Sequence, residues 1–204
     1  MFQEIRHAAR TLRKHPGFAV TAVVTLALAI GATTTIFGVV DAVIIRPLPF
    51  VAPDRLVQLW ETTPQGADFS ASDPDFVDFS ARNRSLTGLA AYKQADLALT
   101  GNGEPQQLHG MAISHTLFAI LGQRPALGRT FRADEDAAGD SSRVVILSHA
   151  LWSGRFGSDS SLVGGTVMLN ARPYTVVGVM PVQYKFPEAD VYVPLHADAR
   201  SARD

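Results

Sequence analysis

The sequence contains no cysteine and only three lysines among its 204 residues. Without cysteine the chain can form no disulfide and offers neither a thiol nucleophile nor a cysteine-type zinc or iron–sulfur site. None of the lysines, Lys14, Lys93 and Lys185, follows a glycine, which excludes the phosphate-binding loop in which a lysine reaches the terminal phosphates of a nucleotide. Gly-x-Gly-x-x-Gly and Gly-x-Ser-x-Gly are also absent. The net charge of −1 provides no basic field for nucleic acid.

One long apolar run lies near the N-terminus. No charged side chain occurs between Pro16 and Val40, and apolar residues resume after Asp41. A helix over this run extends about 37 Å at 1.5 Å per residue, whereas the hydrocarbon core of a bilayer is about 30 Å thick. We therefore predict a transmembrane helix over residues 18–45 that contacts membrane lipid.

Basic residues are concentrated before this run. Four precede it and two lie at a similar distance after it: Arg6, Arg10, Arg13, Lys14, Arg46 and Arg55. An excess of Lys and Arg marks the cytoplasmic side of a span. The pattern predicts an inner-membrane protein with a cytoplasmic N-terminus and residues 46–204 in the periplasm.

A cleaved signal peptide is the alternative, because Ala27-Leu28-Ala29 resembles a cleavage site. Signal peptides have apolar regions of about 7–15 residues, and cleavage after Ala29 would leave the apolar segment 30–45 at the mature N-terminus. The length of the run favours an uncleaved anchor. Within it, Ala27, Gly31 and Thr35 recur every fourth residue, a spacing that lets helices approach closely, so the span is predicted to pack on a helix of another chain or of a part missing from this sequence.

The first 17 residues are predicted to form a cytoplasmic, amphipathic, basic helix. Phe2, Ile5, Ala9 and Leu12 are spaced by three, four and three residues, which places them on one helical face. Such a helix would lie on the inner membrane surface. The alternative is an ordinary basic flank of the span.

The remaining segment, 46–204, is predicted to be a mixed α+β domain because strands outnumber helices without strict βαβ alternation. Residues 46–55 contain three prolines and predict an extended linker. Residues 133–142 predict a solvated loop, either an acidic turn or a cation site. The expected strands are 56–60, 89–92, 97–100, 106–113, 143–147, 166–170, 174–179 and 191–195, and the expected helices begin after the caps Ser72, Ser114 and Ser148 and cover 115–121 and 149–156.

No catalytic, cofactor-binding or metal-binding residue can be assigned from the sequence. His109 and His115, with Glu104 nearby, could form a metal pair if they shared one strand, but Gly110 and Ser114 indicate a change from strand to helix between them. His149, Asp73 and Asp75 occupy positions typical of a first helical turn, which Asp residues favour through the helix dipole. Without a convergent acid–base set, we expect no enzyme activity.

Five blocks of the sequence resemble the periplasmic core domain of MacB-like and FtsX-like ABC transporter permeases, and most closely the orphan-permease subset. They are EIRHAARTLRKHPGF (4–18), RPLPFVAPDRLVQLW (46–60), SDPDFVDFSARNRSLTGLAAY (72–92), GRTF (128–131) and VVILSHALWSGRFGSDSSLVGGTVMLNARPYTVVGVMP (144–181). Where this family often has Asp-Gly or Asn-Gly in a hairpin, this chain has Asn170-Ala171, and Ala tolerates a positive φ less well than Gly.

The resemblance implies a permease subunit that couples ATP hydrolysis in the cytoplasm to motion of a periplasmic domain, for efflux or mechanotransmission. The first implied partner is a cytoplasmic ABC ATPase subunit, and ATP would bind only to that subunit. The other implied partners are a second copy of the chain or further permease spans, and a periplasmic adaptor. Such permeases have four spans, so the chain resembles an N-terminal fragment whose core domain is incomplete. The alternatives are a membrane-anchored module that binds protein or peptidoglycan in the periplasm, and a periplasmic hydrolase.

Overall fold

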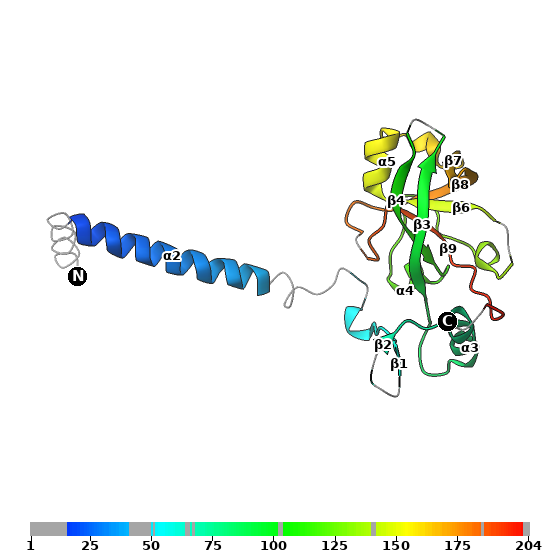
Figure 1. Ribbon diagram of the computed structural model, residues 1–204, viewed down its shortest axis with the longest axis horizontal. Coiled ribbons are helices and arrows are strands. Elements are labelled where there is room, and N and C mark those ends of the chain that lie inside the picture. The colour runs from blue at the N-terminus through cyan, green and yellow to red at the C-terminus, as the bar shows by residue number, and fades with distance from the viewer. Residues whose placement is uncertain are drawn as a thin grey trace. The chain divides into compact units, whose positions relative to one another are not determined.

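The computed structural model describes residues 16–40, 50, 52–63, 66, 68–101, 104–139, 142–184 and 186–201. The chain divides into two compact units, residues 1–49 and 50–204. In the first, α2 (Pro16–Val40) is one continuous helix of 25 residues (Figure 1). Its segment Pro16–Gly38 is long and apolar enough to cross a membrane. The predicted basic helix over residues 1–15 and the end of the predicted span, residues 41–45, lie outside the described residues.

The second unit is built around a closed, six-stranded barrel (Figure 1). In the order β8-β6-β9-β4-β3-β7 each strand pairs with the next, and β7 also pairs with β8, which closes the ring. The pairs β4–β9 and β6–β8 are parallel and the others are antiparallel. The six strands are β3 (Tyr92–Thr100), β4 (Gln106–Ile113), β6 (Val144–Leu147), β7 (Thr166–Leu169), β8 (Arg172–Val179) and β9 (Val191–Pro194).

Short elements surround the barrel. The strand β5 (Leu127–Gly128) adds to the outer side of β8, and β1 (Glu61–Thr62) pairs with β2 (Asp68–Phe69) in a separate ribbon. The helices of this unit are α3 (Asp73–Arg82), α4 (Leu117–Ile120) and α5 (His149–Phe156), with 3-10 turns at Pro53–Arg55, Asp134–Asp136 and Ser160–Leu162. The predicted α+β class is therefore confirmed.

Two apolar clusters stabilise the barrel. All six strands contribute to the interior cluster, which includes Leu97, Leu108, Val145, Leu169, Val176 and Val193. Alternate residues of β6 and β9 point the other way, into an outer cluster with α4 that includes Ile146, Tyr192 and Phe118. Because β6 is buried on both faces, it has the continuous apolar sequence typical of an internal strand.

Two helix starts agree with the predicted caps. The Ser148 hydroxyl accepts a hydrogen bond from the Leu151 N–H at 3.1 Å, and α5 ends at Gly157, which has a φ of 59°. Ser72 caps α3 in the same way through the Asp75 N–H, and its hydroxyl also donates to the Asp75 carboxylate. These local signals positioned both helices correctly.

Four predicted elements differ from the structure. Residues 56–60 form no strand. Of the strand predicted at 89–92 only Tyr92 is in a strand, β3, which continues to Thr100 and so includes the strand predicted at 97–100. The helix after Ser114 covers only Leu117–Ile120, because the Ser114 hydroxyl accepts from the Ala91 N–H at 3.0 Å instead of capping the helix.

The segment 46–55, predicted to be extended, contains a 3-10 turn at Pro53–Arg55, and residues 46–49 and 51 lie outside the described part of the chain. The strands predicted at 166–170 and 174–179 do form a hairpin, but its turn is Asn170-Ala171 and not the loop 171–173 expected between them, because Arg172 and Pro173 belong to β8. The two turn residues have φ values of 50° and 59°. The Asn170 side chain also accepts from the Ala98 N–H and donates to the Asp96 carbonyl, which fastens the turn to β3.

Gly128, in the GRTF block, is required by a close approach between strands. Its φ is 73°, and a Cβ there would lie 2.1 Å from the Val177 carbonyl oxygen. No side chain larger than hydrogen fits this contact. The glycine lets the chain pass directly over β8 and places the following residue, Arg129, at the edge of the barrel.

Candidate functional site

Most threonine hydroxyls of the apolar helix α2 are paired within the helix. Four of its five threonines, at positions 21, 25, 33 and 35, each donate to the carbonyl four residues earlier, at 2.8–3.0 Å. A hydroxyl left unpaired in hydrocarbon would be unfavourable. The helix can therefore lie in lipid although eight of its 25 residues are threonine or glycine.

The two histidines considered as a metal pair contact different carboxylates. His109 lies on β4, where its backbone N–H, not its ring, donates to the Asp190 carboxylate at 2.9 Å. His115 follows β4, and its Nδ1 is 3.1 Å from an oxygen of Asp136. The described residues contain no group of three or more His, Asp or Glu side chains that could hold a metal ion, and Glu104 is exposed.

The acidic loop predicted to be solvated is instead fastened to the barrel. Glu135 is only 8% exposed, and its two carboxylate oxygens accept from the two terminal nitrogens of Arg129 at 2.8 and 2.6 Å. The Arg132 N–H donates to the same carboxylate at 2.9 Å. The hydrogen bonds from Arg129 hold the pKa of Glu135 below its ordinary value of 4.5, against the opposing effect of burial.

Asp136, the next residue, joins the chain segments that follow two neighbouring parallel strands, β4 and β9. One carboxylate oxygen accepts from the N–H groups of Leu195 and His196 at 2.9 and 3.0 Å. The other accepts from the N–H of His115 at 2.8 Å. With its side chain 8% exposed, Asp136 fixes the chain leaving β9 to the chain leaving β4. We call Glu135 and Asp136 the acidic clasp.

The sequence alone did not reveal the clasp, because the run ADEDAAGDSS is typical of a solvated loop. One signal could have pointed to it. Arg129 is a charged residue between Gly128 and an apolar core residue, Phe131, which is 5% exposed, and a cation at such a place needs a carboxylate partner. The separation of 59–60 residues between Asp136 and its partners after β9 has no local signature.

Apolar side chains gather on the segment before the barrel. Val57, Leu59 and Trp60 are 67%, 56% and 53% exposed. Within the described part of the chain, the backbone N–H groups of residues 57–60 have no hydrogen-bond acceptor. An extended segment with free backbone groups can accept another strand, so this is the candidate interaction surface of the domain.

Together these features define a class of protein: an α+β domain joined to an apolar helix that is long enough to cross a membrane. The chain belongs to the family of MacB-like periplasmic core domains, whose model matches residues 19–204. Domains of this family are parts of ABC permeases and are typically non-catalytic.

Solved structures with a similar fold come from permeases of several bacteria. The periplasmic region of MacB from Actinobacillus actinomycetemcomitans is 17% identical, with 69% of this chain and 58% of that chain covered and a TM-score of 0.48. The extracellular domain of the noncanonic ABC-type transporter YknZ from Gram-positive bacteria is 19% identical, with 59% of this chain and 61% of that chain covered and a TM-score of 0.49. A domain of a putative permease protein from Porphyromonas gingivalis is 17% identical, with 63% of this chain and 59% of that chain covered and a TM-score of 0.44. The chain thus spans 58–61% of the length of these structures. No curated protein matches it.

Proposed function

We propose that the chain is the N-terminal part of a permease subunit of a MacB-like ABC transporter. The observation that carries the proposal is that an apolar helix of membrane-spanning length is followed directly by a domain of the MacB-like periplasmic core family. In this arrangement residues 1–17 lie in the cytoplasm, residues 18–45 span the inner membrane, and residues 46–204 form the periplasmic domain.

The proposed mechanism is mechanical. A partner ATPase subunit binds and hydrolyses ATP in the cytoplasm, contacts residues 1–17, and shifts α2 together with other permease spans or a second copy of the chain. The closed barrel supports this role because every one of its six strands has two neighbours, so it moves as a unit. Its motion would act on a periplasmic adaptor for efflux or mechanotransmission.

Co-purification from native membranes tests the proposal. We expect a cytoplasmic ABC ATPase subunit to be recovered with the tagged chain, and the double variant Arg10→Glu, Arg13→Glu to lose it. The matched control is Arg55→Glu, a charge reversal outside the proposed cytoplasmic segment, which should retain the ATPase. Absence of an ATPase from wild-type preparations would contradict the proposed function.

The lack of native cysteine makes the orientation easy to measure. Single cysteines at Gln3 and at the exposed Gln183 can be labelled in whole cells with a maleimide that crosses the outer but not the inner membrane. We expect labelling of Gln183→Cys in intact cells and of Gln3→Cys only after permeabilisation of the inner membrane. The opposite pattern would reverse the proposed topology.

The exposed segment 57–60 favours a second candidate, a membrane-anchored periplasmic module that binds another protein without transport. This candidate predicts a periplasmic partner that is recovered without any ATPase and is lost in the variant Leu59→Lys. Recovery of an ATPase with the wild-type chain, as described above, separates the two functions.

A further inference from the structure

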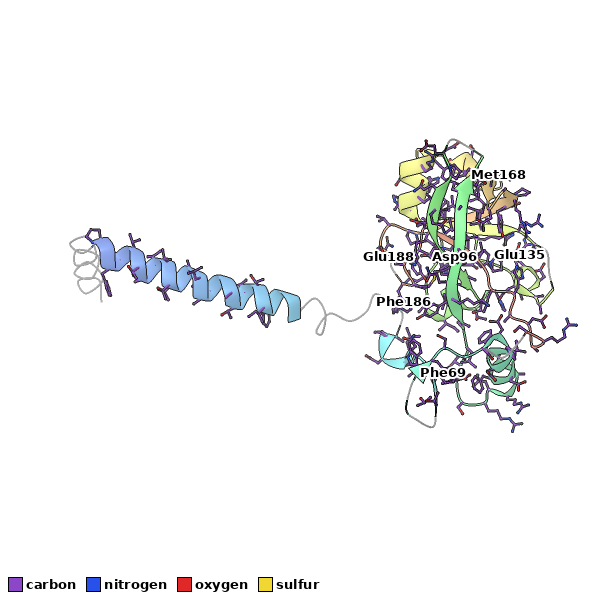
Figure 2. All side chains as sticks on the ribbon, in the orientation of Figure 1. Phe69, Asp96, Glu135, Met168, Phe186 and Glu188 are labelled. Atoms are coloured by element: carbon purple, nitrogen blue, oxygen red, sulfur yellow. The ribbon has the colours of Figure 1, made fainter. Side chains whose placement is uncertain are left out.

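Four side chains from three distant parts of the sequence converge at the start of the barrel domain. The ring of Phe186 (labelled in Figure 2) meets the ring of Tyr92 edge-to-face, with centroids 5.7 Å apart. The ring of Phe50 meets Phe186 in the same manner at 5.7 Å. The Gln58 amide donates a hydrogen bond to the Tyr92 hydroxyl at 3.1 Å. We call Phe50, Gln58, Tyr92 and Phe186 the aromatic anchor.

The backbone of the segment that contains Phe50 and Gln58 is weakly held. Its backbone hydrogen bonds among the described residues are local, from the Arg55 N–H to the Ala52 carbonyl and from the Leu56 N–H to the Pro53 carbonyl. Among the described residues, those at 57–60 have no backbone partner, and the ribbon that follows has only two paired positions. Side chains must therefore fix this segment to the barrel, and the anchor and Leu56, which packs against the outer cluster, are the ones that do so.

We propose that the aromatic anchor fastens residues 50–58 to the start of β3, so that a displacement of α2 is passed to the barrel instead of being absorbed by this segment. The use of the anchor in coupling rests on the proposed function, whereas the fastening itself does not. Tyr92 is the first residue of β3, the longest strand of the ring. A pull on the membrane-proximal segment would thus act on the strand that pairs with both β4 and β7.

The anchor is placed for fastening more than for barrel stability. Phe50 is half-buried and packs against the outer cluster from outside. Phe186, which contacts the Phe50 and Tyr92 rings, is 41% exposed, whereas Phe118 within the cluster is 1% exposed. An edge-to-face aromatic pair changes a local equilibrium about two- to tenfold. Loss of the Phe50 ring should therefore release the segment while the barrel remains folded.

Trypsin cleavage after the exposed Arg55 measures the fastening directly on the full chain in detergent. We expect Phe50→Ala and Phe186→Leu each to raise the cleavage rate about two- to tenfold, and the double variant to exceed either single variant only slightly, because both remove the same ring pair. Phe186→Leu retains apolar volume. The matched control Phe79→Ala removes an equally exposed ring of α3 and should change the rate less than twofold.

Unchanged cleavage in both variants, or an equal rise in Phe79→Ala, would overturn the fastening. Coupling is tested in the complex with the ATPase, using an environment-sensitive fluorophore on a single cysteine at the exposed Gln107 of β4. We expect Phe50→Ala to hydrolyse ATP at the wild-type rate but to lose more than half of the ATP-dependent signal, and a retained signal would overturn the coupling. Failure to recover an ATPase would reject the proposed function while leaving the cleavage result intact.

Discussion

Replacement of Asp136 by Asn should destabilise the barrel domain because an amide cannot accept from both sides. The carboxylate accepts three backbone hydrogen bonds, two on one oxygen and one on the other, and its side chain is 8% exposed. In its better orientation Asn keeps the acceptor for the two N–H groups after β9 and turns its NH₂ group toward the N–H of His115. This leaves one buried donor facing another donor.

The magnitude follows from the groups involved. An orphaned buried N–H costs about 1–3 kcal/mol, and each of the two remaining bonds weakens by up to about 1 kcal/mol when its acceptor loses the charge. The sum is about 3 kcal/mol. For a domain of 150–250 residues 1 kcal/mol shifts Tm by about 2–4 °C, so Asp136→Asn should lower Tm by about 6–12 °C.

Thermal unfolding of the full chain in detergent, followed by intrinsic fluorescence, measures this shift. Trp152 is a suitable reporter because it packs against the interior cluster of the barrel and its ring N–H donates to the Asp159 carbonyl at 2.9 Å. The control is Asp134→Asn, the same substitution on an exposed residue of the same 3-10 turn. Equal Tm values for the two variants would refute the role assigned to Asp136.

The other predictions use the same assay. The Tyr184 hydroxyl is buried without a hydrogen-bond partner among the described residues, so Tyr184→Phe should raise the unfolding free energy by about 1 kcal/mol. The Tyr192 hydroxyl donates to the Pro187 carbonyl, so Tyr192→Phe should lower the unfolding free energy by about 1 kcal/mol. Gly128→Ala should prevent normal folding because its Cβ would overlap a backbone oxygen, while Gly154→Ala, in an open helical position, should be neutral or add up to about 1 kcal/mol. The lowered pKa of Glu135 stabilises the fold above the ordinary pKa of 4.5 and this stabilisation is lost as pH falls through the lowered value, so a plot of Tm against pH should fall less steeply below 4.5 in Glu135→Gln than in wild type.

Elements with local signals could be predicted from the sequence, and elements that depend on distant partners could not. The cap Ser148 and the stop Gly157 bracket α5 within ten residues, and Gln106–Ile113 has the bounds predicted for it because its apolar side chains alternate. Residues 56–60 have a strand-like sequence, but a strand also needs a neighbour, and the described chain supplies none. In β3 the exposed polar residues Lys93, Gln94 and Asp96 resemble a turn until the pairing with β4 is known.

The candidate sites follow the same division. Sequence reasoning gave the membrane-spanning length of the apolar run and the family resemblance, which the family match to residues 19–204 confirms. It missed the acidic clasp and the aromatic anchor, because their hydrogen bonds join residues far apart in the sequence. Gln58 and Tyr92 are separated by 34 residues, and Asp136 and its partner Leu195 by 59. Such contacts are set by the topology of the ring, which no short motif encodes.

The position of β9 has a consequence for biogenesis. β9 is the last strand of the described chain and lies inside the ring, between β4 and β6, so those two strands remain without their shared neighbour until Val191–Pro194 has been synthesised. In the proposed topology, in which the domain is exported N-terminus first, β4 and β6 therefore keep exposed strand edges until β9 has followed them. During that interval the nascent domain is vulnerable to proteases and to mispairing.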